Sequence, residues 1–362
     1  MADDGRGVAG AREPAAKGGG EPAPDGGEPD ALPLVEACER LASPWASDSF
    51  SAACGQPWVA VELAGAAPSP DAADALRRGL AELPCPSFAI VPERGAPAAR
   101  ELADAFDVVL EPGDALAPLV EAVKRAPLAA AALAQLLRGG EARSVEQGLV
   151  AESSVYSMLQ AGPEFAAWLA SQPTLRPEIP ESPPLVAARE GAQLELVLAN
   201  PAKRNAYSAE LRDRLCEALQ LAVADEAIEE IVLRGEGPAF CAGGDLDEFG
   251  LLVDPATAHA IRTTRSAARL LARCAGRVRA EIHGACVGAG IELPAFAGRV
   301  VARSDAWMQL PELAMGLVPG AGGTVSLPRR IGRQRTAWLA LSGARVGAET
   351  AASWGLVDEI VS

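Results

Sequence analysis

The sequence predicts an α/β protein built from repeated strand, turn and helix segments. Short apolar runs at 58–63, 194–198 and 278–282 have the length and composition of buried strands. Turns containing glycine or proline follow them, and helical segments come after the turns. Hydrophobic residues make up 49% of the 362, enough for a substantial core. We therefore expect stacked ββα units.

Composition excludes several classes of protein. The net charge of -16 argues against non-specific binding to nucleic acid or to an anionic membrane. The seven cysteines form no C-x-x-C pair, which disfavours a zinc site and predicts reduced thiols in a cytoplasmic protein. No apolar signal segment and no run of about 18 apolar residues is present, so we expect neither a signal peptide nor a membrane span.

Changes in composition divide the chain into five segments. Residues 1–31 lack large apolar side chains and predict a disordered tail. Residues 32–111 predict a small α/β unit of unknown role, and 112–172 predict a helical region. Five prolines make 173–184 a stiff linker. Residues 185–362 hold the motifs that carry chemistry.

Two carboxylates in glycine-rich surroundings are the strongest candidates for proton transfer. Glu292 lies in GAGIEL at 288–293, on the first turn of an expected helix, and Glu312 follows Pro311 among apolar neighbours. A carboxyl group in apolar surroundings has a raised pKa unless it is paired. The simpler interpretations are a charge that complements a helix dipole for Glu292 and a surface turn residue for Glu312.

Two small-residue loops could supply free backbone N–H groups. The segment 242–244 follows a strand and precedes a helix, and 288–290 opens the helix that bears Glu292. Glycine allows such N–H groups to approach a substrate closely, and two donors aimed at one point would stabilise an enolate oxygen. Tight turns without any such role are the alternative.

Other chemically active side chains receive structural interpretations. We expect His283 to be structural and His259 to lie on a solvated helix face. No histidine or lysine is clearly placed to activate Cys241 or Cys286, so both are interpreted as small packing residues. Asp245 is interpreted as a cap or a loop-fixing group.

Several motifs in one order resemble the crotonase superfamily of enoyl-CoA hydratases and isomerases. The resemblance covers residues 185–361, and it is specific because it combines many motifs. The motifs are NPAKRNA at 200–206, FCAGGDL at 240–246, GAGIEL at 288–293, PE at 311–312 with PGAGGT at 319–324, and GLVDEIV at 355–361. The resemblance implies the crotonase superhelix of ββα units.

The resemblance also implies a reaction. The substrate would be an acyl-CoA thioester, with no metal and no cofactor beyond the coenzyme A of the substrate. The N–H groups of Ala242 and Ala289 would hold the thioester oxygen. Having both glutamates favours hydration of a trans-2-enoyl-CoA, in which Glu292 activates water and Glu312 supplies the α-proton. An isomerase would need mainly Glu312; an acyl-CoA hydrolase and a non-catalytic acyl-CoA-binding or assembly protein are further alternatives.

By the same resemblance, eight residues of these motifs would bind the substrate. They are Lys203, Asn205, Ala206, Gly243, Gly244, Asp245, Gly288 and Gly320. Ala289 stands where the hydratase pattern commonly has glycine, and its methyl group could narrow the acyl pocket.

The order of segments departs from the family. Members continue beyond the GLVDEIV element with helices that complete the acyl pocket and build a trimer, whereas this sequence ends at Ser362. Residues 108–170 resemble that missing run. We therefore expect a permuted or fused arrangement, with helices 115–170 packed on the 185–362 core and a homotrimer or dimer of trimers. The alternative is an unrelated regulatory domain. The family's tail often carries a lysine that meets the CoA phosphates, and 165–173 contains none.

Overall fold

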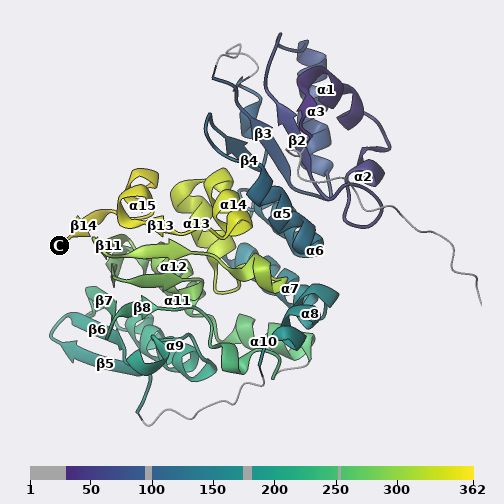
Figure 1. Cartoon of the computed structure of the whole chain (residues 1–362). Helices are drawn as coiled ribbons and strands as arrows, with labels where there is room; N and C mark the ends of the chain where they lie inside the picture. Colours follow the sequence, from purple (N-terminus) through teal and green to yellow (C-terminus); the bar gives the residue numbers. More distant parts are fainter. Residues whose placement is uncertain (1–29, 94–99, 174–181, 252–253) are drawn as a thin grey trace, which may run out of the picture.

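The computed structural model describes residues 30–93, 100–173, 182–251 and 254–362. Nearly all of the expected tail, and most of the expected linker, lie outside these ranges. Figure 1 shows a small sheet with its own helices at one end of the molecule and a larger α/β body beside it. Within the described ranges, no helix is long and apolar enough to cross a membrane.

The small N-terminal unit is a four-stranded parallel sheet covered by helices. Its strands, in sheet order, are β1 (Leu32–Pro33), β2 (Val59–Glu62), β3 (Ser87–Ile90) and β4 (Val108–Leu110). Its α-helices are α1 (Leu34–Leu41), α2 (Ala46–Ser49) and α3 (Pro70–Glu82). The side chain of Ser69 caps α3 and Pro70 occupies its first turn, as the local sequence requires. The unit has a hydrophobic cluster of its own, formed largely by one face of the sheet with α1 and α3.

Four helices follow the N-terminal sheet. They are α5 (Ala117–Arg125), α6 (Pro127–Arg138), α7 (Val145–Gln160) and α8 (Pro163–Ser171). Ser144 and Gln147 form a reciprocal capping box at the start of α7. Gly162 and Pro163 separate α7 from α8, because proline fits a first helical turn but cannot continue the preceding helix.

The C-terminal half contains two further sheets. The larger one is parallel except for its edge strand β5, and it has the order β14–β11–β9–β7–β6–β5. The smaller one has the order β13–β12–β10–β8, with β13 antiparallel. The strands are β5 (Leu185–Glu190), β6 (Gln193–Leu198), β7 (Glu230–Gly235), β8 (Ala239–Cys241), β9 (Val278–Ile282), β10 (Ala285–Val287), β11 (Arg299–Arg303), β12 (Trp307–Gln309), β13 (Val346–Gly347) and β14 (Glu359–Val361).

Helices alternate with these strands and give the expected strand–helix repeat. They are α9 (Ala209–Ala224), α10 (Pro255–Thr264), α11 (Ala267–Arg273), α12 (Ala289–Glu292), α13 (Gly323–Ile331), α14 (Arg333–Ser342) and α15 (Ala348–Trp354). Short 3₁₀ turns η2 (Pro201–Lys203), η3 (Leu246–Glu248) and η6 (Glu312–Met315) lie in the loops that matter for the site.

The helices α5 to α8 pack onto the C-terminal half. α7 lies against α10, α11 and α13, α5 and α6 lie against α14, and α8 lies against η6 (Figure 1). One hydrophobic cluster runs from the N-terminal sheet through α5 and α6 into the C-terminal sheets. The packing that the permuted arrangement requires is therefore present in this fold.

A buried carboxylate fastens the N-terminal unit to the helices. Asp107 is 1% exposed and pairs with Arg138 of α6 at 2.5 Å and with Arg333 of α14 at 2.9 Å. It also accepts hydrogen bonds from the backbone N–H and hydroxyl of Ser87. Removing one partner of such a network would leave a buried charge uncompensated, so Asp107 joins the unit firmly to the body.

Candidate active site

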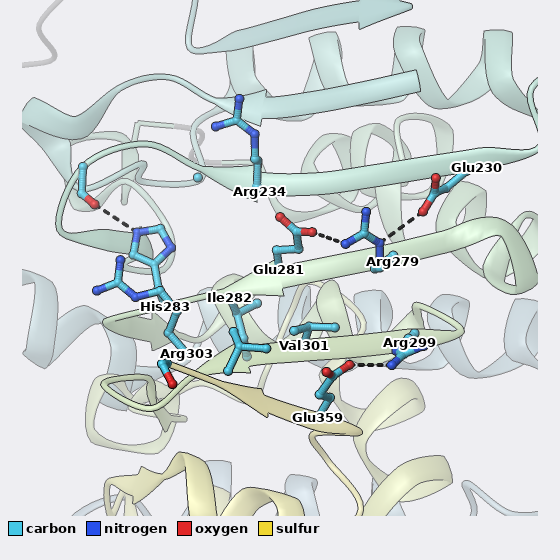
Figure 2. A pocket seen from close by; sticks show the side chains of 14 residues that line it. Glu230, Arg234, Arg279, Glu281, Ile282, His283, Arg299, Val301, Arg303 and Glu359 are labelled. Atoms are coloured by element: carbon cyan, nitrogen blue, oxygen red, sulfur yellow. Dashed lines mark hydrogen bonds and ion pairs between the residues drawn. The ribbon is translucent and has the colours of Figure 1, made fainter. Parts of the chain in front are cut away.

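Two concavities are candidates for a functional site. The first, about 730 Å³, lies on the outer face of the six-stranded sheet. Figure 2 shows that several of its charged side chains, on β7, β9, β11 and β14, form ion pairs with one another. Arg279 bonds to both Glu230 and Glu281, and Arg299 bonds to Glu359. The carboxylates of this face are thus paired with arginines, and the Nε2 of His283 lies 3.0 Å from the carbonyl oxygen of Gly237.

The second cavity, about 570 Å³, brings the predicted chemistry together. Most of the residues predicted for the site line it, although they come from segments far apart in the sequence. The predicted residues that line it are Ala242, Gly243, Gly244, Asp245, Ala289, Glu292, Glu312 and Gly320. Helices α7 and α10 also contribute to its wall. We take this cavity as the candidate active site.

Glu292 is held by the loop that leads into α13. It is 2% exposed, and its Oε2 accepts hydrogen bonds from the N–H groups of Ala321 and Gly323, both at 2.8 Å. Burial raises the pKa of this carboxyl to about 7, although the two hydrogen bonds oppose the rise. Near neutral pH Glu292 can therefore both accept and release a proton.

A third carboxylate, which sequence reasoning missed, lies beside Glu292. Glu152 of α7 is 2% exposed and accepts hydrogen bonds from the N–H of Gly322 at 2.7 Å, and from the N–H and hydroxyl of Thr324 at 2.9 and 2.6 Å. Burial, and then the charge of Glu292, raise its pKa to about 8. The only sequence signal was an acidic residue at 152 within a helix expected to pack on the core.

The two carboxylates share the loop in an alternating pattern. The N–H groups of Ala321 and Gly323 point to Glu292, and those of Gly322 and Thr324 point to Glu152. Such donors at the start of a helix favour negative charge. Glu152 thus fixes the same stretch of backbone that positions Glu292.

The carboxyl group of Glu312 differs from that of Glu292 in its hydrogen bonding. Its Oε2 is buried and has no hydrogen-bond partner among the described residues. Burial, followed by the charge of Glu292, raises its pKa well above the ordinary value. Gly288, at φ +49°, leaves the space for it, because a Cβ there would lie 2.5 Å from Glu312 Oε1. Glu312 is therefore set up to hold a proton.

The two expected oxyanion donors differ in this structure. The N–H of Ala289 makes no hydrogen bond within the described part of the chain. The N–H of Ala242 instead donates to the carbonyl of Arg204 at 3.0 Å. Arg204 has a positive φ of 52°, which directs this carbonyl within a left-handed turn. Both alanines line the cavity, but only Ala289 presents an unused donor.

Four of the predicted substrate-binding residues lie outside the cavity lining. Asn205 is fully buried, and its side chain bonds to the backbone of Asn200, Glu236 and Ala239, so it holds the loop together instead. Lys203 is paired with Asp245 at 3.1 Å and with Asp247 at 2.7 Å, which neutralises its charge. The other two are Ala206 and Gly288.

The structure also tests the interpretations of the two loop cysteines, Asp245 and His259. Cys241 and Cys286 are buried with raised pKa values, and burial is the main cause, which confirms packing roles. Asp245 caps η3 by accepting the N–H of Asp247, and it also lines the cavity. The expectation of a solvated His259 is wrong, since its Nδ1 lies 2.9 Å from a hydroxyl of α7.

The wall formed by α7 and α10 is polar. Arg262 of α10 donates to Ser153, Ser157 and Gln160 of α7, and its guanidinium lies 4.7 Å from the ring centre of Tyr156. The ring of Tyr156 packs against Gly320, and any side chain at position 320 would collide with this ring. No group of three or more His, Cys, Asp or Glu in the described ranges could hold a metal ion.

Comparison with known proteins identifies the family. Residues 189–362 match the enoyl-CoA hydratase/isomerase family. The chain is 35% identical over 178 residues to 2,3-dehydroadipyl-CoA hydratase of Escherichia coli (strain K12). The aligned region covers 49% of this chain and 68% of that relative. The protein belongs to the enoyl-CoA hydratase/isomerase family. It is an enzyme of the crotonase superfamily with that superfamily's α/β fold.

Other relatives of this hydratase/isomerase differ in activity. One is 1,2-epoxyphenylacetyl-CoA isomerase of Escherichia coli (strain K12), 33% identical over 178 residues, covering 48% of this chain and 67% of that relative. Among solved structures, an enoyl-CoA hydratase from Thermoplasma volcanium GSS1 is 36% identical with a TM-score of 0.46, covering 50% of this chain and 73% of that one. The family match begins at residue 189, so Glu152 and the helices α5 to α8 lie outside it.

Proposed function

We propose that this enzyme is an enoyl-CoA hydratase that adds water to a trans-2-enoyl-CoA. The observation that carries the proposal is the presence of Glu292 and Glu312 in one cavity with two small-residue loops. Two carboxyl groups allow one to accept a proton from water while the other donates a proton to carbon. The substrate is an acyl-CoA thioester, as in the names of the relatives.

The environments of the two glutamates support separate roles. Glu292, with a pKa of about 7, takes a proton from water as the oxygen bonds to the β-carbon. Glu312, whose pKa burial raises well above the ordinary value and whose Oε2 has no hydrogen-bond partner among the described residues, gives its proton to the α-carbon. Environments that separate the pKa values of two carboxyl groups assign the base and the acid. In the reverse direction Glu312 removes the α-proton.

The intermediate between these steps carries negative charge on the thioester oxygen. Ala289 supplies the unused backbone N–H, and its helix dipole favours the developing charge. Ala242 takes part once its N–H exchanges the carbonyl of Arg204 for the thioester oxygen. A substrate analogue with a charged enolate oxygen should therefore bind more tightly than the ground-state thioester.

An enoyl-CoA isomerase is the second candidate. The unpaired Oε2 of Glu312 favours it, because an isomerase can move one proton between two carbons with a single carboxyl group. Acyl-CoA hydrolysis and non-catalytic binding or assembly are the remaining alternatives. Binding that Glu292→Gln and Glu312→Gln leave unchanged, without turnover, would favour the non-catalytic protein.

We also propose that the N-terminal half supplies the helices that other family members carry at their C-terminus. The support is the packing of α7 on α10, α11 and α13, and of α8 on η6, which carries Glu312. In this arrangement residues 112–172 complete the acyl pocket. A homotrimer or dimer of trimers, a cytoplasmic location and the lack of a further cofactor remain predictions.

The test is the loss of conjugated enoyl-thioester absorbance when the full chain is mixed with crotonyl-CoA. We expect loss with the wild type, with water added at the β-carbon, and a fall of at least about 100-fold for Glu292→Gln and Glu312→Gln. Glu210→Gln, an exposed change on α9 outside the cavity, is the matched control. Turnover that survives Glu292→Gln but not Glu312→Gln would support the isomerase instead.

A further inference from the structure

Charged side chains of both signs line the catalytic cavity. Four arginines line it, although the chain as a whole carries a net charge of -16. They come from α9, the end of α10 and α11, and they are Arg212, Arg262, Arg265 and Arg269. Six carboxylates line the cavity as well, so each arginine has to be examined for a carboxylate that pairs with it directly.

Side chains of this protein compensate only part of this charge. Arg212 pairs with the neighbouring Asp213, and Arg265 reaches the exposed Glu217 at 3.8 Å. Within the described residues, neither Arg262 nor Arg269 has a carboxylate within 4.0 Å. The Nε of Arg269 is moreover buried without any hydrogen-bond partner in that part of the chain. No described carboxylate therefore forms a direct ion pair with either of these two guanidinium groups.

Arg262 is held in a fixed position by neutral groups. It donates to the hydroxyls of Ser153 and Ser157 and to Oε1 of Gln160, at 3.1 Å for the last. Burial lowers its pKa, and the neutral partners leave its charge intact. A guanidinium that is fixed beforehand loses little entropy when it binds a planar anion.

Tyr156 contacts both Arg262 and the glycine loop beside Glu292. Its ring lies under the guanidinium of Arg262 and against Gly320, at the loop that holds Glu292. Burial raises the pKa of its hydroxyl, and Arg262 on one side and Glu312 and Glu292 on the other also influence it. The ring thus contacts both the arginine and the glycine loop, and its hydroxyl makes no hydrogen bond to the described residues.

We propose that the acyl group of the natural thioester ends in a carboxylate, and that the guanidinium of Arg262, with the hydroxyl of Tyr156 beside it, receives that carboxylate. The proposal rests on the thioester function above and names its substrate class. The phosphates of coenzyme A are separated from the thioester carbon by the whole pantetheine arm. A guanidinium in the wall of the cavity that contains Glu292 and Glu312 is therefore placed for the acyl group, and a charge-assisted bond there would select a carboxylated chain.

Calorimetric binding of saturated thioesters tests the proposal without any need for turnover. Pentanoyl-CoA and glutaryl-CoA have chains of the same carbon number, and they end in a methyl group and a carboxylate. We expect the full-length wild type to bind glutaryl-CoA at least about 10-fold more tightly, because hydrogen bonds to charged groups have that magnitude. Arg262→Met should remove the difference while pentanoyl-CoA affinity stays within about 2-fold.

Controls separate the possible causes. Arg273→Met removes an exposed guanidinium of α11 that pairs with Glu146, and it should leave both affinities unchanged. Tyr156→Phe keeps the ring and should reduce the preference for glutaryl-CoA by a few-fold. If Arg262→Met does not fold, as judged by circular dichroism, the wild-type preference and Tyr156→Phe still decide the question.

Two results would overturn the proposal. One is equal affinity of the wild type for the two thioesters. The other is an equal loss of affinity for pentanoyl-CoA, glutaryl-CoA and free coenzyme A in Arg262→Met, which would assign the arginine to a phosphate. Failure to hydrate any enoyl thioester would refute the hydratase but would leave this binding preference standing, so the two failures are distinguishable.

Discussion

Replacing Glu152 by glutamine tests whether the N-terminal half holds the active site in place. The change keeps the size of the side chain but replaces one carboxylate oxygen by an NH2 group. Glu152 accepts three hydrogen bonds, from the N–H of Gly322 and from the N–H and hydroxyl of Thr324. An amide offers only one oxygen, so in either orientation at least one of these buried backbone N–H groups faces another donor.

The cost follows from that unpaired donor. A buried N–H without an acceptor costs about 1–3 kcal/mol, and removal of the repulsion between Glu152 and Glu292 offsets part of it. We expect Glu152→Gln to lower the free energy of unfolding by about 1–2 kcal/mol. Because the N–H groups bound to Glu292 alternate with those bound to Glu152, a shifted loop should also lower kcat by about 10- to 100-fold.

Urea unfolding followed by circular dichroism measures the stability, and hydration of crotonyl-CoA measures the rate. Glu146→Gln is the matched control, since it makes the same chemical change in the first turn of the same helix. Its side chain is 54% exposed and pairs with Arg273, so we expect a loss below about 1 kcal/mol. Glu152→Gln with the stability and kcat of Glu146→Gln would refute the positioning role.

Three further predictions concern pH and packing. The raised pKa values of Glu292 and Glu152, about 7 and about 8, mean that the folded state binds more protons than the unfolded state above the ordinary value of 4.5. The free energy of unfolding that these two groups contribute should therefore be fully present below pH 4.5 and be lost as the pH rises to about 8. The slope should be at most about 1.4 kcal/mol per pH unit for each proton, and urea unfolding across pH measures it. Gly288→Ala should lower kcat by at least about 10-fold in the hydration assay, because its φ is +49° and a Cβ would press on Glu312. Gly148→Val should lower the thermal midpoint by several degrees in calorimetry, because a Cβ at this position of α7 would lie 2.8 Å from a valine of α13.

Each of these predictions has a control. The pH dependence should be shallower in Glu152→Gln, and an equal slope in wild type and variant would contradict the assignment. Gly276→Ala is the control for both glycine changes, because a Cβ there meets no atom within 4 Å. Gly148→Val with the thermal midpoint of Gly276→Ala would show that α7 does not pack closely on α13. Wild-type kcat in Gly288→Ala would show that Glu312 has free space.

Local sequence patterns predicted much of the fold. Apolar runs located the strands β2, β6 and β9 to within one residue at each end. Ser208 caps α9 by accepting the N–H of Leu211, and the helix ends at Ala224. These features depend on side-chain periodicity and on capping within one turn, so a short window of sequence contains the information.

The packing of residues 115–170 on the C-terminal half was also accessible to sequence reasoning, whereas the roles of particular residues were not. Motif resemblance linked 108–170 to the helices expected after 361, and α5 to α8 do pack on the C-terminal half. The same resemblance assigned Asn205 to substrate binding, although its side chain bonds only to backbone groups within the loop region. A motif preserves the type of residue, but it does not say which partner the side chain meets.

The sequence by itself determined the α/β class, the family, and the choice of Glu292 and Glu312 as the acidic pair. Only the tertiary structure decided that Glu152 joins them, because its partners Gly322 and Thr324 lie about 170 residues further along the chain. Periodicity and turn chemistry act between neighbours in sequence. Burial, raised pKa values and the competition of two carboxylates for one loop arise only when distant segments exclude water together.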